Sequence, residues 1–234
     1  MKAPISKVSG PGDSENGDVM KRFGWIIVIV LVVILQLFGA FSGKHPEQKR
    51  KVSMNSTSLD TATFAAGCFW CLEAIYQNLK GVQSVTSGYS GGQTPNPSYT
   101  QVCADTTGHA EACQIAFNPK EISYVELLEV FWKIHDPTTL NRQGNDEGTQ
   151  YRSAIFYHND EQRRLAEHYK KELDASGAFD SPIVTEIMPL KNFYKAEDYH
   201  QNYYNENGNQ PYCRFVIQPK LDKFRKAFKT KLKE

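Results

Sequence analysis

Two cysteines three positions apart are the residues of this chain best suited to chemistry. Cys68 directly follows Gly67, and Cys71 comes one helical turn later. Beyond them, apolar side chains recur at i, i+3, i+4 and i+7 over residues 72–79, which predicts a helix that begins near Cys68. The free N–H groups and the dipole at a helix N-terminus stabilise a thiolate, the reactive form of cysteine. We therefore interpret Cys68 as a working nucleophile, although most unpaired cysteines are only small buried apolar residues.

The remaining cysteines form neither a disulfide framework nor a metal-binding pattern. The chain has five cysteines at irregular spacing, and no second Cys-x-x-Cys pair follows the first. We expect Cys103 and Cys113 to be structural thiols and no metal to be bound. Cys71 lies close enough to Cys68 to attack it, while Cys213 lies in a Gly-, Asn- and Pro-rich stretch that could deliver a distant thiol. Both are candidates for a second, resolving thiol.

The segments around these residues indicate a mixture of helices and strands. A capping box at Ser123–Glu126 predicts a helix that ends before Pro137, Asp160 should cap another, and a third should span about 196–205. Strands are predicted at residues 61–66, 82–88, 112–117, 151–157 and 183–188. Because helices and strands do not strictly alternate, the expected fold class is α+β. We expect one compact domain over 61–234, with a mixed central sheet flanked by helices in a two-layer, ferredoxin-like sandwich.

The N-terminal quarter of the chain has a different composition. Residues 1–22 are polar and rich in Gly, Pro, Ser and Asp, which predicts a disordered tail. Residues 23–41 carry no charge, and a helix of that length, at about 1.5 Å per residue, crosses a hydrocarbon core. We interpret them as a transmembrane anchor. The core of a cleaved signal peptide is the alternative, because residues 40–42 resemble a cleavage site. Residues 42–60 form a linker.

The charges of the chain bear on its location and its partners. Two basic residues precede the apolar segment and four follow it within ten positions, which favours a cytoplasmic C-terminal domain. A first helix can export a domain regardless of this bias, so both sides of the membrane stay open, and a cleaved signal would give a secreted protein. The formal net charge of +1 gives no electrostatic case for a nucleic-acid partner. We expect a monomer.

Several short motifs resemble those of the type A peptide methionine sulfoxide reductases, in the order of that family. The first is residues 67–70, Gly-Cys-Phe-Trp, which resembles the family's active-site signature. The others are residues 88–92, 97–99, 108–111, 143–146 and 148–153. The similarity covers about residues 61–219. It implies reduction of methionine S-sulfoxide, in proteins or free, to methionine, and hence repair of oxidised proteins without a metal or an organic cofactor.

The resemblance also implies a role for each reacting residue. Cys68 would attack the sulfoxide sulfur and become a sulfenic acid. Glu111, at the start of an otherwise apolar strand, would protonate the oxygen, because apolar surroundings raise the pKa of a carboxyl. Cys71 or Cys213 would then close a disulfide, which an external dithiol such as thioredoxin reduces by exchange.

Five further residues are candidates for binding the substrate. Two aromatic rings would surround the methyl group and sulfur, two phenols would hydrogen-bond the oxygen, and a loop aspartate would organise the site. In this order they are Phe69 and Trp70, Tyr99 and Tyr151, and Asp146.

Three points stay open in the sequence. The better-known arrangement of the family has no cysteine at the position of Cys71, so the first disulfide partner is undecided. His109 either orients the carboxyl of Glu111 or simply packs. Two rival functions are a papain-like cysteine hydrolase, which would use His200, and a membrane-anchored thiol sensor without turnover. The hydrolase signature requires Trp directly after the cysteine, where this chain has Phe69.

Overall fold

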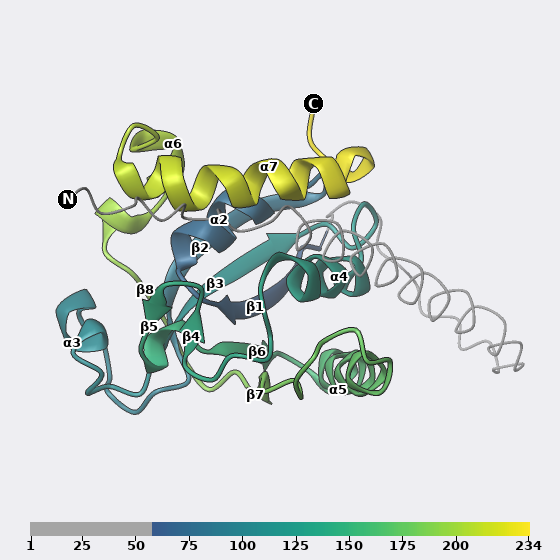
Figure 1. The fold of residues 1–234 in the computed structure, drawn as a ribbon, viewed down its shortest axis with the longest axis horizontal. Helices are drawn as coiled ribbons and strands as arrows, with labels where there is room; N and C mark the ends of the chain where they lie inside the picture. The colour runs from purple at the N-terminus through teal and green to yellow at the C-terminus, as the bar shows by residue number, and fades with distance from the viewer. Residues whose placement is uncertain (1–57) are drawn as a thin grey trace, which may run out of the picture. The chain divides into compact units, whose positions relative to one another are not determined.

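A six-stranded sheet is the framework of the fold (Figure 1). The structure is a computed structural model of the 234-residue chain and describes residues 58–234. The strand order is β7-β6-β1-β3-β2-β8, and all neighbours are antiparallel except the parallel pair β6 and β7. The strands are β1 (Asp60–Ala66), β2 (Val82–Ser90), β3 (Ala110–Phe117), β6 (Ser153–Tyr157), β7 (Glu186–Pro189) and β8 (Phe193–Lys195). The predicted tail, the predicted anchor and most of the predicted linker lie outside the described residues.

Six α-helices of the described part of the chain connect and cover these strands. They are α2 (Phe69–Tyr76), α3 (Tyr99–Cys103), α4 (Tyr124–Ile134), α5 (Asp160–Ala175), α6 (Tyr203–Glu206) and α7 (Gln218–Ala227). Strands β1, β2, β3 and β6 with helices α2 and α4 follow the β-α-β-β-α-β order of the ferredoxin-like motif, and β7 and β8 extend the sheet at its two edges. Helix α7 lies against α2, and α5 lies beside β6 and β7 (Figure 1). Between residues 58 and 234, every helix is too short or too polar to span a bilayer.

The two faces of the sheet are packed differently. On one face the ring of Phe64 in β1 meets the rings of Tyr76, Tyr124 and Phe131, with centroids 5.8, 5.9 and 5.1 Å apart, so α2 and α4 bury their aromatic side chains here. The other face is built mainly from alanines of β1, β3 and β6 and packs against partly buried side chains near β7 and β8. Alternate residues of a strand point to opposite faces, so Glu111 shares the helix-covered face with Cys113 and Ile115. This register places its carboxyl beside α2.

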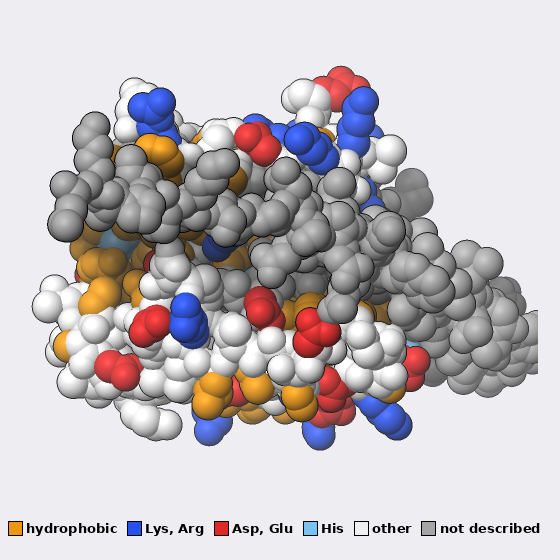
Figure 2. All heavy atoms as spheres, in the orientation of Figure 1, with side chains coloured by type: hydrophobic (Ala, Val, Ile, Leu, Met, Phe, Trp, Pro, Cys, Tyr) orange, Lys and Arg blue, Asp and Glu red, His pale blue; other side chains and the backbone are white. Residues whose placement is uncertain are grey.

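The surface of the described residues carries no single dominant charge on the side that Figure 2 shows. Acidic and basic side chains are interspersed there, outside the grey residues. Some charges of the described residues form close pairs, such as Arg163 with Glu167 and Arg164 with Glu161 on α5.

The structure confirms the α+β class, the mixed sheet and the five predicted strands, with small shifts at their ends. The capping box of α4 forms as predicted, since Ser123 and Glu126 each accept a hydrogen bond from the other's N–H. The cap of α5 differs from the prediction, because the side chain of Asn159, one position before Asp160, accepts the Gln162 N–H at the start of this helix.

Two predicted helices are shorter than the sequence indicates. Helix α2 ends at Tyr76, because the N–H of Lys80 donates to the carbonyl of Lys231, 2.8 Å away, and the chain leaves the helical path. The helix predicted over 196–205 is wrong. A 3₁₀ turn and the one-turn helix α6 occupy this region, separated by Asn202 in the left-handed conformation (φ 55°). A buried carboxylate satisfies the backbone N–H groups at this break, as described below.

Candidate active site

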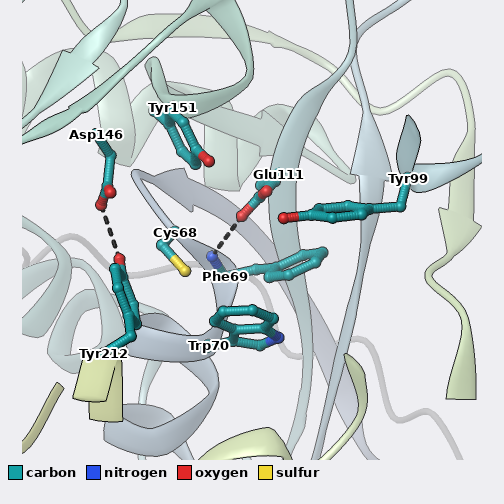
Figure 3. Close-up of a pocket in the computed structure, with 8 residues that line it drawn as sticks. All are labelled: Cys68, Phe69, Trp70, Tyr99, Glu111, Asp146, Tyr151 and Tyr212. Atoms are coloured by element: carbon teal, nitrogen blue, oxygen red, sulfur yellow. Dashed lines mark hydrogen bonds between the residues drawn. The ribbon is translucent and has the colours of Figure 1, made fainter. Parts of the chain in front are cut away.

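A pocket of about 220 Å³ opens where β1 ends and α2 begins. Seven of the residues that line it were singled out from the sequence, and Tyr212 is the eighth (Figure 3). The seven are Cys68, Phe69, Trp70, Tyr99, Glu111, Asp146 and Tyr151. They come from five separate segments of the chain, and the fold brings them together in one pocket.

Cys68 lies at the junction of the central strand β1 with helix α2. It is the N-cap residue of α2, and its side chain is 6% exposed. The preceding residue, Gly67, has a φ of +85°, and a Cβ there would lie 2.6 Å from the Cβ of Gln143. Glycine is therefore required before the cysteine, both for the left-handed turn and for the close approach of the Gln143 side chain.

The carboxyl of Glu111 faces this thiol from β3. It is 1% exposed, and its Oε2 accepts a hydrogen bond from the N–H of Phe69 at 3.0 Å. Burial raises the pKa of Glu111 to about 8, an effect that this single hydrogen bond only partly offsets. A pKa of about 8 favours the protonated carboxyl at neutral pH.

Two phenols stand beside the carboxyl. In Figure 3 the hydroxyl of Tyr99 points toward Glu111, and Tyr151 lies on the other side of the pocket. The pKa of each is raised, mainly by burial, so both hydroxyls stay protonated and can donate hydrogen bonds. The N–H of Tyr99 donates to Oε1 of Glu197, 2.9 Å away, which ties the start of α3 to the segment before α6.

The aromatic side of the pocket is held by residues that the sequence did not single out for this role. The ring of Trp70 stacks on Tyr203, with centroids 3.7 Å apart and an interplanar angle of 7°. Its Nε1 donates to Nδ1 of His200 at 3.2 Å, and His200 also contacts the ring of Phe69. The side chains of Tyr203 and His200, about 130 residues further along the chain, thus fix the Trp70 ring, which would contact a substrate methyl group.

The opposite wall comes from the short hairpin of β4 (Arg142–Gln143) and β5 (Asp146–Glu147). The hydroxyl of Tyr212 donates to Oδ2 of Asp146 at 2.8 Å, so the loop aspartate and the C-terminal segment hold each other in place (Figure 3). Tyr212 also hydrogen-bonds the Cys68 thiol and favours its ionised form. The only sequence signal for this tyrosine was its position directly before Cys213.

The two cysteines of the motif form a coupled pair. Burial raises the pKa of Cys68 well above its ordinary value, and the hydrogen bond to Cys71 and the nearby Glu111 raise it further. The pKa of Cys71 is lowered, because it accepts that hydrogen bond and because the Lys220 ammonium lies 3.9 Å from its sulfur. The expectation that the helix N-terminus favours the Cys68 thiolate is not met by these pKa directions, which favour ionisation of Cys71 over that of Cys68.

The other thiols and histidines have clear places. Cys213 is fully buried at the start of the π-helical segment Cys213–Ile217, so the prediction of a loop position is wrong. Cys113 is buried in β3, and Cys103 is exposed at the end of α3. His109 packs: its Nδ1 accepts the Gly92 N–H, and its Nε2 contacts the Thr94 carbonyl oxygen at 2.8 Å. It does not orient Glu111.

A buried thiol opposite a protonated carboxyl, with a second thiol one helical turn away, is the site of a thiol-dependent reductase. The comparisons with known proteins agree. The family model described as peptide methionine sulfoxide reductase matches residues 60–232. The chain belongs to the peptide methionine sulfoxide reductase family.

Individual relatives place it within the type A branch. The chain is 56% identical over 175 residues to the peptide methionine sulfoxide reductase MsrA of Saccharolobus solfataricus, a match that covers 75% of this chain and 98% of that protein. It is 58% identical over 174 residues to the MsrA of Leptospira borgpetersenii, with 74% and 98% covered.

Two solved structures share the fold. The reduced form of Mxr1 from Saccharomyces cerevisiae superposes with a TM-score of 0.61 at 36% identity, covering 70% of this chain and 94% of that one. The methionine sulfoxide reductase A of Corynebacterium diphtheriae gives a TM-score of 0.58 at 37% identity, covering 64% and 75%.

The activity follows from this membership. The protein is a peptide-methionine (S)-S-oxide reductase, which uses thiols to reduce methionine sulfoxide and repairs oxidised proteins. It requires a thioredoxin-type reductant and no prosthetic cofactor. The rival interpretations, a cysteine hydrolase or a sensor without turnover, have no support. The histidine that the hydrolase would need, His200, accepts a hydrogen bond from Trp70 instead of pairing with Cys68.

Proposed function

We propose that Cys68 is the nucleophile and Glu111 the acid of this reductase. The observation that carries the proposal is the pairing, in one pocket, of a buried thiol with a carboxyl whose pKa is raised to about 8. A sulfoxide oxygen leaves only if it gains a proton, and a neutral carboxyl supplies one at physiological pH. The other titratable groups of the pocket support this assignment, because the two phenols hold their protons too tightly to act as the acid.

The first half of the reaction transfers the oxygen to the protein. Cys68 passes its proton to the neighbouring Cys71 thiolate and attacks the sulfoxide sulfur, while Glu111 protonates the oxygen. The S–O bond of the substrate breaks, methionine leaves, and Cys68 becomes a sulfenic acid. The substrate sulfur is reduced by two electrons and the Cys68 sulfur is oxidised by two, so no other oxidant or reductant takes part.

The aromatic residues and the loop aspartate bind and orient the substrate in this scheme. Phe69 and Trp70 contact its methyl group and sulfur, where each sulfur–aromatic contact contributes about 0.3–1.5 kcal/mol. Tyr99 and Tyr151 donate hydrogen bonds to the oxygen without adding charge. Asp146 acts through Tyr212, whose hydroxyl it holds beside the Cys68 thiol.

The second half returns the enzyme to its reduced form. A second thiol, Cys71 or Cys213, attacks the sulfenic sulfur of Cys68, a disulfide forms, and the hydroxyl leaves as water. A thioredoxin-type dithiol then reduces this disulfide by exchange and is itself oxidised. Cys71 supports the first attack by its hydrogen bond with Cys68, and Cys213 lies near enough to Cys71 to have its own pKa raised by that thiolate.

Trapping the intermediate tests these assignments. The full-length chain carrying Cys71→Ser and Cys213→Ser would be mixed with a methionine sulfoxide peptide and a 1,3-dione that alkylates sulfenic acids. Mass spectrometry should place the adduct on the peptide that contains Cys68, and adding Glu111→Gln should slow its appearance. An adduct on Cys103 or Cys113 alone, with methionine still formed, would contradict the assignment of the nucleophile.

We also propose that residues 23–41 anchor the enzyme to a membrane by a single span, with the signal-peptide alternative described above. The support is the sequence: 19 positions without a charge, long enough to cross the hydrocarbon core. The full-length protein should stay in the membrane fraction after alkaline washing, whereas a variant with two arginines in this segment should be released. Release of the intact wild-type chain would rule out the anchor, and a mature protein that begins near residue 42 would identify a cleaved signal.

A further inference from the structure

Lys220 is placed where the proposed reaction needs a positive charge. It lies near the start of α7, which packs against α2, and its Nζ is 3.9 Å from the Sγ of Cys71. The lysine is half-buried and the cysteine is 3% exposed, so little solvent screens the pair. Within residues 58–234, this ammonium makes no other hydrogen bond and no ion pair with a carboxylate.

The chain upstream of Lys220 is shaped to bring α7 to this position. The five residues Cys213–Ile217 form a π-helical turn, a rare conformation that occurs mostly at functional sites. Pro219 follows this widened turn, and a proline inside a helix lacks the N–H for the usual hydrogen bond and crowds the carbonyl four residues earlier. The wider turn accommodates the proline and presents both Cys213 and Lys220 toward α2.

The charges around Cys71 show why the cation matters. The groups that face its sulfur are the thiols of Cys68 and Cys213, the hydroxyl of Tyr212, and the carboxyls of Asp146 and Glu111. A Cys71 thiolate therefore lies close to the carboxyl of Asp146. It also lies close to Glu111, which is ionised once it has given its proton to the sulfoxide oxygen. Lys220 is the one cation among the groups that act on it.

We propose that Lys220 holds Cys71 as a thiolate and thereby makes Cys71, ahead of Cys213, the thiol that attacks the oxidised Cys68. This inference rests on the proposed function and decides the step that it leaves open. The Cys71 sulfur attacks the sulfur of the Cys68 sulfenic acid, the S–S bond forms, and the S–O bond breaks. Cys71 gives up the proton that it received from Cys68 in the first half, and the departing hydroxide takes up that proton and leaves as water, so Cys71 is oxidised and the Cys68 sulfur is reduced. Lys220 does not touch the substrate and is a positioning residue.

The test is a single turnover of the full-length chain without an external reductant. Stopped reactions would be analysed for methionine and, by mass spectrometry, for the disulfide and its partners, in wild type, Lys220→Met and Lys220→Arg. Methionine keeps the apolar stem of lysine and removes the charge, while arginine keeps the charge. Lys226→Met, on an exposed position of the same helix, is the control for removing a lysine from α7.

The first disulfide of the wild-type chain should join Cys68 to Cys71. At neutral pH its formation should slow roughly tenfold in Lys220→Met, because loss of an adjacent charge raises a thiol pKa by about one to three units and the more basic thiolate is only partly compensated by greater nucleophilicity. The formation of methionine should slow less, because Lys220 acts on the attacking Cys68 only indirectly, through the proton that Cys68 passes to Cys71. The deficit should shrink as pH rises and the Cys71 thiol ionises without help, and Lys220→Arg and Lys226→Met should resemble wild type.

Three results would overturn this role. One is a first disulfide between Cys68 and Cys213 in the wild-type chain. Another is disulfide formation in Lys220→Met at the wild-type rate. The third is a deficit that is the same at every pH, which would indicate a change of packing. All three are compatible with Cys68 as the nucleophile, whereas loss of methionine formation in wild type would defeat the proposed function itself.

Discussion

Two buried carboxyls, Glu111 on β3 and Glu73 within helix α2, show how surroundings give the same side chain different properties. Glu111 and Glu73 are each 1% exposed. Glu111 accepts a single backbone N–H, from Phe69, and lines the pocket. Glu73 accepts the N–H groups of Asn202 and Tyr203, at 2.8 and 3.2 Å, together with the Ser87 hydroxyl.

The number of hydrogen-bond donors is one cause of the difference, beside the stronger desolvation of Glu111. Burial raises the pKa of both carboxyls, but three donors to Glu73 favour its ionised form, and one donor leaves Glu111 with a pKa of about 8. Glu111 can therefore give a proton to a substrate. Glu73 instead satisfies the backbone at the break before α6, where Asn202 adopts the left-handed conformation and Tyr203 meets Trp70. One carboxyl is suited to acid catalysis and the other to structure.

The largest effect should come from removing the acid. Glu111→Gln keeps the shape and the hydrogen bond from Phe69 but cannot donate the same proton. Methionine formation in a single turnover should fall by about 10²- to 10⁴-fold, the usual range for a lost general acid, while circular dichroism shows that the variant is still folded. A rate within twofold of wild type would show that Glu111 does not supply the proton, and hence that the two carboxyls do not differ in this property.

The pH dependence of this effect should follow the raised pKa. Glu111 stays protonated up to about pH 8 and loses its proton above it, so the ratio of wild-type to Glu111→Gln rates should shrink as pH rises through 8. The free energy of unfolding should depend on ionisation of the same Glu111 carboxyl. Because the native carboxyl (pKa about 8) binds a proton that the unfolded one (4.5) releases, wild type should lose stability relative to Glu111→Gln between about pH 4.5 and 8. Urea titrations across this range would measure it, and parallel stabilities would argue against a raised pKa.

Removing the structural carboxylate should act mainly on stability. Glu73→Gln replaces one acceptor oxygen by an amide that faces backbone N–H donors, and leaving such a buried group unsatisfied costs about 1–3 kcal/mol. Chemical denaturation should detect this loss, and the single-turnover rate at saturating substrate should stay within a few-fold of wild type. A catalytic loss as large as that of Glu111→Gln, in a protein of normal stability, would remove the distinction between the two carboxyls.

The smallest effect should come from removing the ring of Tyr203, whose backbone N–H donates to Glu73. Tyr203→Leu removes the stack behind Trp70, and an aromatic pair contributes about 0.5–1.5 kcal/mol beyond its buried area. The KM for a methionine sulfoxide peptide should rise a few-fold with little change in kcat. Phe215→Leu, at an exposed aromatic position, is the matched control and should leave KM unchanged. Equal effects of the two variants would show that the stack does not position Trp70.

Local sequence patterns predicted the elements near the site well. The Gly67–Cys68 step, the apolar stripe of α2 and the alternation of β3 each depend on neighbours in the chain, so the start of α2 and the acid on β3 could be placed in advance. The motif order then singled out seven of the eight residues that line the pocket.

Long-range contacts account for what could not be predicted. The helix expected over 196–205 breaks because Glu73, 129 residues away, accepts the Asn202 N–H. Lys220, whose ammonium helps to lower the pKa of Cys71, lies 149 residues beyond Cys71 and has no local signal in the sequence. Tyr212 likewise enters the site only because the C-terminal segment returns to the β4–β5 hairpin.

The most direct test of the account uses the two sulfoxide epimers separately. The full-length chain and its Cys68→Ser variant would each be incubated with a peptide that carries one methionine sulfoxide epimer, in the presence of excess dithiothreitol, and the methionine formed would be measured. The account predicts turnover of the S epimer alone by wild type and none by a folded Cys68→Ser variant. Continued turnover in Cys68→Ser would contradict the central claim that this thiol takes the oxygen from the substrate.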